Sequence, residues 1–161
     1  MAAIRPARAD DHPAILKLWH QGWHEAHAHL VPPALLAFRT PEHFSVWLEE
    51  CTDAFYVADD NGVVGGFVSV KGSEVVKLYV AADARGGGIA ARLLAHGEAV
   101  LAEAGVAEAM LLCTAGNRRA ERFYARNGWE LTSTRDDALW LPAGIAGAFS
   151  IATHRFAKQL G

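Results

Sequence analysis

Residues 74–90 read EVVKLYVAADARGGGIA, and this stretch decides the fold. Its first part, Glu74–Val80, is rich in β-branched and apolar residues and predicts a strand. It leads through Ala81–Ala84 into Arg85–Gly88, which opens a helix with apolar positions at helical spacing. A strand that runs into a glycine-rich turn at a helix start leaves several backbone N–H groups unpaired, where the helix dipole also favours an anion. The sequence therefore predicts a phosphate-binding turn.

Two familiar phosphate loops do not match this turn. The pattern GxxxxGK[ST] is absent because no Lys-Ser or Lys-Thr follows the glycines, and GxGxxG is absent because its third glycine is missing. A nucleoside triphosphatase is thereby disfavoured. For these residues taken alone, a plain flexible turn without a ligand is the alternative.

A different signature, [Gln/Arg]-x-x-Gly-x-[Gly/Ala], fits Arg85, Gly88 and Ala90. It resembles the acetyl-CoA-binding motif of the Gcn5-related N-acetyltransferase (GNAT) family. A second block, residues 117–129 with the sequence NRRAERFYARNGW, is similar to the Asn-x-x-Ala-x-x-Phe-Tyr-x-x-x-Gly-[Phe/Trp] segment of that family. The resemblance covers residues 74–134 in detail and the rest of the chain in outline.

The resemblance implies a single N-acetyltransferase domain over residues 1–161. Its fold class would be α/β, with an antiparallel meander followed by a parallel strand pair that splays around the cofactor, all flanked by helices. Periodicity and turn signals agree with this fold. They predict strands at 3–5, 54–58, 63–70, 74–81, 108–114, 129–134 and 150–157. They predict a first long helix that is capped at Asp10 or Asp11 and carries Trp19 and Trp23, and further helices at 33–50 (broken), 88–104 and from Asn117 to Asn127. The almost wholly apolar run Glu108–Thr114 is typical of a strand buried on both faces.

The resemblance also implies a binding site for acetyl-CoA as co-substrate, with no metal. The diphosphate would rest on the backbone amides of Arg85–Ala91, and the pantetheine arm would pair with the backbone of the preceding strand. The implied cofactor-binding residues are Leu78, Tyr79, Val80, Arg85, Gly86, Gly87, Gly88, Ile89, Ala90, Ala91, Asn117 and Tyr124. The Arg85 side chain would offset phosphate charge. Asn117 is suited to cap its helix, to contact the coenzyme, or to do both.

Acetyl transfer needs a neutral amine, a donor for the developing oxyanion and a proton for the leaving thiolate. By resemblance Tyr124 is the general acid, and a phenol with a pKa of ~10 suits that role; a half-buried aromatic beside Phe123 is the alternative. Glu74 lies on the cofactor strand, where some relatives carry a catalytic glutamate. It is the candidate base, with a solvated strand-end carboxylate or a water chain as alternatives. No histidine is near Cys113 in sequence, which favours direct attack by the amine over an acetyl-cysteine intermediate.

Three histidines, His20, His24 and His27, recur at helical spacing on one face of the first long helix, with His29 just beyond. Imidazoles at this spacing can hold a divalent metal, but no carboxylate or cysteine ligand is evident at a useful offset. No native metal site is predicted, and a histidine-dependent metalloprotein is the third-ranked function. In relatives this region borders the acceptor pocket, so His24, His27 and His29 are candidate bases or substrate contacts.

Composition limits the partners. The chain has 161 residues, 52% of them hydrophobic, and a net charge of −3. This is enough apolar material for one core and gives no general attraction to nucleic acid or membrane. Cys51 and Cys113 lie outside any ligand spacing and are typical of buried thiols, and the N-terminus lacks a signal-peptide layout. We therefore expect a cytoplasmic protein.

The acceptor stays open between a small-molecule amine and a peptide amine. The rival function is a non-catalytic domain that binds or senses acyl-CoA. The uncharged stretch 139–149 fits a cap over the acceptor site, a contact in a homodimer, or an ordinary connection packed on the core, which we favour.

Overall fold

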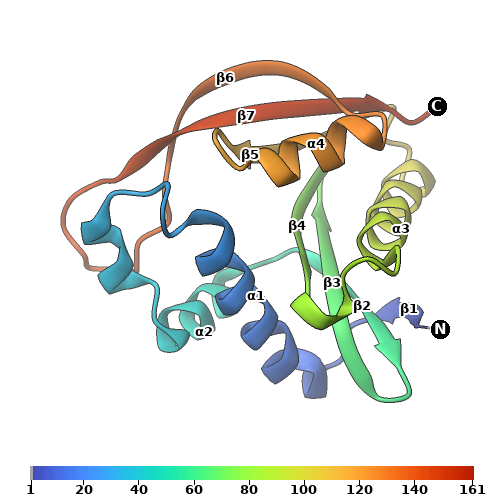
Figure 1. The fold of residues 1–161 in the computed structure, drawn as a ribbon, viewed down its shortest axis with the longest axis horizontal. Helices are drawn as coiled ribbons and strands as arrows, with labels where there is room; N and C mark the ends of the chain where they lie inside the picture. The colour runs from blue at the N-terminus through green and yellow to red at the C-terminus, as the bar shows by residue number, and fades with distance from the viewer. Residues whose placement is uncertain (1) are drawn as a thin grey trace.

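The computed structural model describes residues 2–161 and shows one mixed sheet with helices on both faces (Figure 1). The strands are β1 (Ala3–Pro6), β2 (Ala54–Asp60), β3 (Val63–Lys71), β4 (Glu74–Val80), β5 (Glu108–Thr114), β6 (Glu130–Ala138) and β7 (Ser150–Gln159). The helices are α1 (His12–His27), α2 (Pro41–Glu50), α3 (Ile89–Glu103) and α4 (Arg118–Arg126), with short 3-10 turns at Ala9–Asp11, Pro33–Phe38 and Ala82–Ala84. No helix in this described range is both long and apolar enough to cross a membrane.

The sheet order is β1-β2-β3-β4-β5-β7-β6, and every neighbouring pair is antiparallel except β4 and β5. These two parallel strands are in register only at Glu74 and Met110, and beyond that point they diverge (Figure 1). The predicted meander and the predicted splayed pair are both confirmed. Because the diverging edges have no partner strand, they leave backbone hydrogen-bonding groups and open space between them.

A bulge interrupts β4. Ser69 of β3 pairs with Lys77, but the next residue, Val70, pairs with Val75, so Val76 is an extra residue on β4. An extra residue bends a strand and re-aims the side chains beside it. As a result the Lys77 ammonium lies over the Trp19 ring of α1, 5.0 Å from its centroid.

Two cores hold the helices on the sheet. On one face α3 and α4 pack against β3, β4, β5 and β7, with Leu93, Leu94 and Leu101 of α3 almost fully buried. The apolar stripe predicted for this helix is confirmed. On the other face α1 and α2 pack through Trp19 and Phe44, which meet edge to face at 5.0 Å.

The expectation that β5 is buried on both faces is wrong. Ala109, Leu111 and Cys113 are buried on one face, but Leu112 on the other is 39% exposed. The reason is the splay, because Leu112 borders a pocket beside β4 instead of packed side chains. Cys51 likewise differs from expectation: it is only half-buried, at the end of α2.

The connection between β6 and β7 packs on the α1/α2 core through Leu139 and Phe149. Trp140 stacks on Trp47 with centroids 4.8 Å apart and planes at 5°. Arg39, which is 1% exposed, lies against these two indoles and donates a 2.8 Å hydrogen bond to the Trp140 carbonyl. The connection is therefore tied to the core at both of its ends.

Candidate active site

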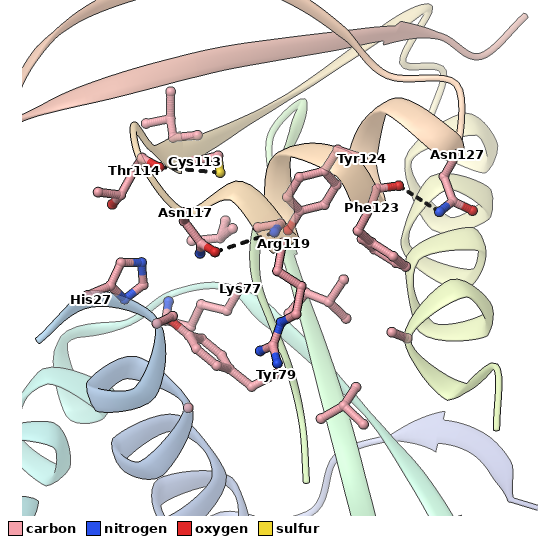
Figure 2. A pocket seen from close by; sticks show the side chains of 18 of the residues that line it. His27, Lys77, Tyr79, Cys113, Thr114, Asn117, Arg119, Phe123, Tyr124 and Asn127 are labelled. Atoms are coloured by element: carbon pink, nitrogen blue, oxygen red, sulfur yellow. Dashed lines mark hydrogen bonds between the residues drawn. The ribbon is translucent and has the colours of Figure 1, made fainter. Parts of the chain in front are cut away.

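A pocket of about 820 Å³ opens between the splayed strands. Its walls come from α1, β4, the turn before α3, the first turn of α3, β5, α4 and the β6–β7 pair. Of the twelve predicted cofactor-binding residues, all but Gly87 line it. The structure therefore brings together two blocks that lie far apart in sequence, as the view in Figure 2 shows for Tyr79, Asn117 and Tyr124.

The glycine-rich turn presents a row of backbone donors to this pocket. Gly86 and Gly88 have φ values of +86° and +81°, a conformation that favours glycine. In the described chain the first backbone N–H bonded at this end of α3 is that of Arg92, which donates to the Gly88 carbonyl at 3.1 Å. The N–H groups of Gly86–Ala91 have no acceptor within residues 2–161. Unpaired amides at the start of a helix are suited to a phosphate group.

Arg85 lies where the motif predicts, but its guanidinium is already paired. Glu25 of α1 accepts hydrogen bonds from Arg85 Nη1 at 2.5 Å and Nη2 at 2.9 Å, and from Arg119 Nη1 at 3.4 Å. The hydrogen bond from Arg85 is the main reason why the pKa of Glu25 is lowered. The sequence held no sign of Glu25, because nothing local links α1 to a turn 60 residues away.

Tyr124 lies on the α4 wall of the pocket. Its ring packs against Phe123 and Phe156, with centroids 5.4 Å and 5.9 Å away. Burial, with smaller contributions from Cys113 and Tyr79, raises the pKa of the Tyr124 phenol, so its proton is retained at neutral pH. Burial also raises the pKa of the Cys113 thiol to about 12, which makes it a poor nucleophile.

Asn117 is the helix cap that the sequence predicted. Its side-chain oxygen accepts a hydrogen bond from the Ala120 N–H at 3.3 Å, drawn as a dashed line in Figure 2. The same side chain also borders the pocket. Capping is thus established, and a coenzyme contact is compatible with it.

Glu74 does not line the large pocket. It borders a second one of about 330 Å³, on the side of β4 that faces α2. The ten residues that line this second pocket are Trp47, Glu50, Cys51, Thr52, Asp53, Lys71, Glu74, Val76, Lys77 and Trp140. Val76 and Lys77, at the bulge, line both pockets. Burial, and next the charge of Asp53, raise the pKa of Glu74 above its ordinary value.

The other acidic side chains of the second pocket already accept hydrogen bonds from neighbouring side chains. Asp53 accepts from Lys77 Nζ at 2.6 Å and from Ser69 Oγ at 2.8 Å, and the Asp53 and Lys77 side chains are 6% and 9% exposed. Glu50 accepts from Trp140 Nε1 at 3.2 Å. Glu74 is thereby the carboxylate of this pocket most suited to accept a proton.

His24 and His27 of α1 both bond to backbone carbonyls, but only His27 borders the large pocket. His24 Nε2 bonds to the Arg39 carbonyl at 2.7 Å, and His27 Nδ1 bonds to the Trp23 carbonyl at 3.2 Å. Since a carbonyl only accepts, these two nitrogens carry protons. His27 lines the large pocket, whereas His24 does not, and burial lowers the pKa of His27 to about 4. Within residues 2–161 no group of three possible metal ligands is found.

Solved N-acetyltransferase structures share this fold over almost the whole chain. A GCN5-related N-acetyltransferase from Rhodopseudomonas palustris is 18% identical with a TM-score of 0.74, covering 99% of this chain and 96% of its own. A ribosomal-protein-alanine N-acetyltransferase from Brucella melitensis is 24% identical, with a TM-score of 0.71 and coverage of 98% and 99%. The PaiA N-acetyltransferase from Thermoplasma acidophilum, solved with coenzyme A, is 16% identical, with a TM-score of 0.69 and coverage of 99% of both chains.

The family follows from the sequence itself. The model of the Acetyltransferase (GNAT) family matches residues 13–129, which is more than half of the chain, so the protein belongs to that family. The resemblance predicted from the two sequence blocks is confirmed. No curated protein sequence matches the chain.

Proposed function

We propose that the protein is an N-acetyltransferase that moves the acetyl group of acetyl-CoA to a primary amine of a small molecule or peptide. The observation that carries this proposal is the row of unpaired N–H groups on Gly86–Ala91, which opens onto the pocket between β4 and β5. Membership of the GNAT family supports it, as does the coenzyme A bound to the PaiA relative.

In this proposal the cofactor occupies the gap between the diverging strands β4 and β5. Its diphosphate rests on the amides of Gly86–Ala91 at the positive end of α3. Its pantetheine arm lies along Leu78–Val80, in the place where a neighbouring strand would pair. A backbone N–H of this segment donates to the thioester carbonyl oxygen and stabilises the negative charge that develops there.

The two proton transfers then occur on opposite sides of β4. The amine nitrogen attacks the thioester carbon, the C–N bond forms and the C–S bond breaks. Tyr124 donates its phenolic proton to the departing thiolate on the α4 side. Glu74, which borders the second pocket, takes the proton of the amine through a water at Val76 and Lys77, where the two pockets meet. Its raised pKa makes it a better base than an ordinary carboxylate.

The test is amine-dependent release of free thiol from acetyl-CoA, measured over a panel of small amines and peptides, with the acetylated product detected by mass. We expect thiol and acetyl-amine in equal amounts for at least one acceptor. Calorimetry with coenzyme A, run beside it, separates the rival function, because a sensing domain gives heat of binding but no thiol with any amine. The absence of binding heat would remove the cofactor site and with it the enzymatic assignment.

A further inference from the structure

Three charged side chains from three elements meet at the mouth of the large pocket. Arg85 comes from the turn before α3, Arg119 from the first turn of α4 and Glu25 from α1. Both arginines line the pocket, and both donate to the same Glu25 oxygen, Oε1. Figure 2 shows the Arg119 side chain reaching from α4 across the pocket toward Tyr79 of β4.

The two guanidinium groups of this cluster are suited to bind phosphate, and the Glu25 carboxylate takes the place that a phosphate would have. A guanidinium binds a carboxylate and a phosphate in the same way, through parallel N–H groups to two oxygens. Arg85 uses both terminal nitrogens on Glu25 in this manner. The turn that carries Arg85 also supplies the unpaired amides of Gly86–Ala91. A diphosphate on those amides therefore arrives beside two arginines that Glu25 neutralises.

The solvent exposure of the three side chains indicates that a phosphate group can replace Glu25 in its contact with the two arginines. The side chains of Arg85, Glu25 and Arg119 are 31%, 45% and 62% exposed. Ion pairs this open to water are weak, so a ligand with more negative charge can replace the carboxylate at small cost. The buried pair of Lys77 and Asp53, by contrast, would leave an unpaired charge in the core if it opened.

We propose that Glu25 occupies Arg85 and Arg119 in the free protein, and that the phosphate groups of the cofactor, which the motif already places beside Arg85, displace Glu25 and bring Arg119 into the same contact. The inference rests on the proposed use of acetyl-CoA. Displacement releases the end of α1 from the turn. Since α1 also contributes Gly22 and His27 to the pocket wall, cofactor binding is thereby coupled to the position of that wall.

The experiment measures dissociation constants by calorimetry for coenzyme A and for pantetheine, which has the same thiol arm without phosphate. Glu25→Gln removes the competing charge and is expected to bind coenzyme A about 1.5- to fivefold more tightly than the wild type, the range of a weak ion pair. Pantetheine affinity should be unchanged. Asp83→Asn is the matched control, because Asp83 lies just before the same turn and forms no ion pair in the described chain. In the Glu25→Gln background, Arg119→Ala should weaken coenzyme A binding and leave pantetheine unaffected.

Three results would overturn the inference. Weaker binding of coenzyme A to Glu25→Gln would mean that Glu25 positions the arginines instead of competing for them. Equal tightening in Asp83→Asn would mean that only overall charge matters. Unchanged affinity in Glu25→Gln would mean that the contact is irrelevant to the cofactor. In all three cases the wild type still binds coenzyme A, so the proposed function survives; if the wild type binds neither ligand, both proposals fall.

Discussion

Replacing Tyr124 by Phe removes one oxygen and leaves the ring in place between Phe123 and Phe156. No hydrogen bond of the Tyr124 hydroxyl is found within residues 2–161 and the contacts of the ring are kept, so the free energy of unfolding should change by less than about 0.5 kcal/mol. The loss of a general acid, in contrast, should lower kcat by about 10² to 10³, which corresponds to about 2.7–4 kcal/mol of transition-state stabilisation.

The assay compares kcat for thiol release, the dissociation constant of coenzyme A and the melting temperature of the variant and the wild type. Tyr56→Phe is a matched control, since it loses the same oxygen from a tyrosine that lines neither pocket. We expect the Tyr124 variant to lose turnover while coenzyme A binding and melting temperature stay within error. A fall in kcat of less than threefold, or a parallel loss of coenzyme A affinity, would refute the assignment of Tyr124 as the acid.

Three further substitutions test other parts of the site. Glu74→Gln should lower kcat by about 10². Because a general base works only when deprotonated and the pKa of Glu74 is raised, wild-type activity should rise with pH above the ordinary glutamate range. The pH profile of the variant should lack this rise and keep only the rise that is due to deprotonation of the amine. Asp53→Asn leaves the Lys77 ammonium buried without its partner, so we expect about 3–5 kcal/mol of destabilisation and a melting temperature lower by about 6–20 °C, partly restored in a double variant that also has Lys77→Met. Gly22→Ala would place a Cβ 2.4 Å from the Tyr79 ring, so a loss of about 1–3 kcal/mol should outweigh the gain in helix propensity; a more stable variant in chemical denaturation would contradict this close approach.

The parts of the molecule that sequence predicted are those with local physical signals. The helix α3 follows from its apolar spacing, and α4 begins at an Asn117 cap and ends before Gly128 at φ +87°. The glycine-rich turn and most of its pocket-lining neighbours follow from the motif, because a motif states which residues share one backbone conformation. These features need no knowledge of the rest of the fold.

The parts that sequence missed depend on contacts between distant elements. Glu25 meets Arg85 across 60 residues, and Lys77 meets Asp53 across 24. Neither pair has a periodicity or a spacing that marks it. The exposure of Leu112 was missed for the same reason, since an apolar run shows which residues avoid water but not that a strand pair parts beside them.

The electrostatics of the site also constrain how the proposed reaction resets. After transfer, Glu74 holds the proton of the amine and Tyr124 is left as a phenolate. Burial raises the pKa of Tyr124, so the phenolate is costly in this environment and must regain a proton before the next turnover. The two groups lie on different pockets that meet at the bulge residues Val76 and Lys77. A direct return of the proton would have to cross this boundary a second time, whereas Tyr124 borders the large pocket itself. We infer that solvent reprotonates Tyr124 once the products leave, and that Glu74 loses its proton separately through the second pocket.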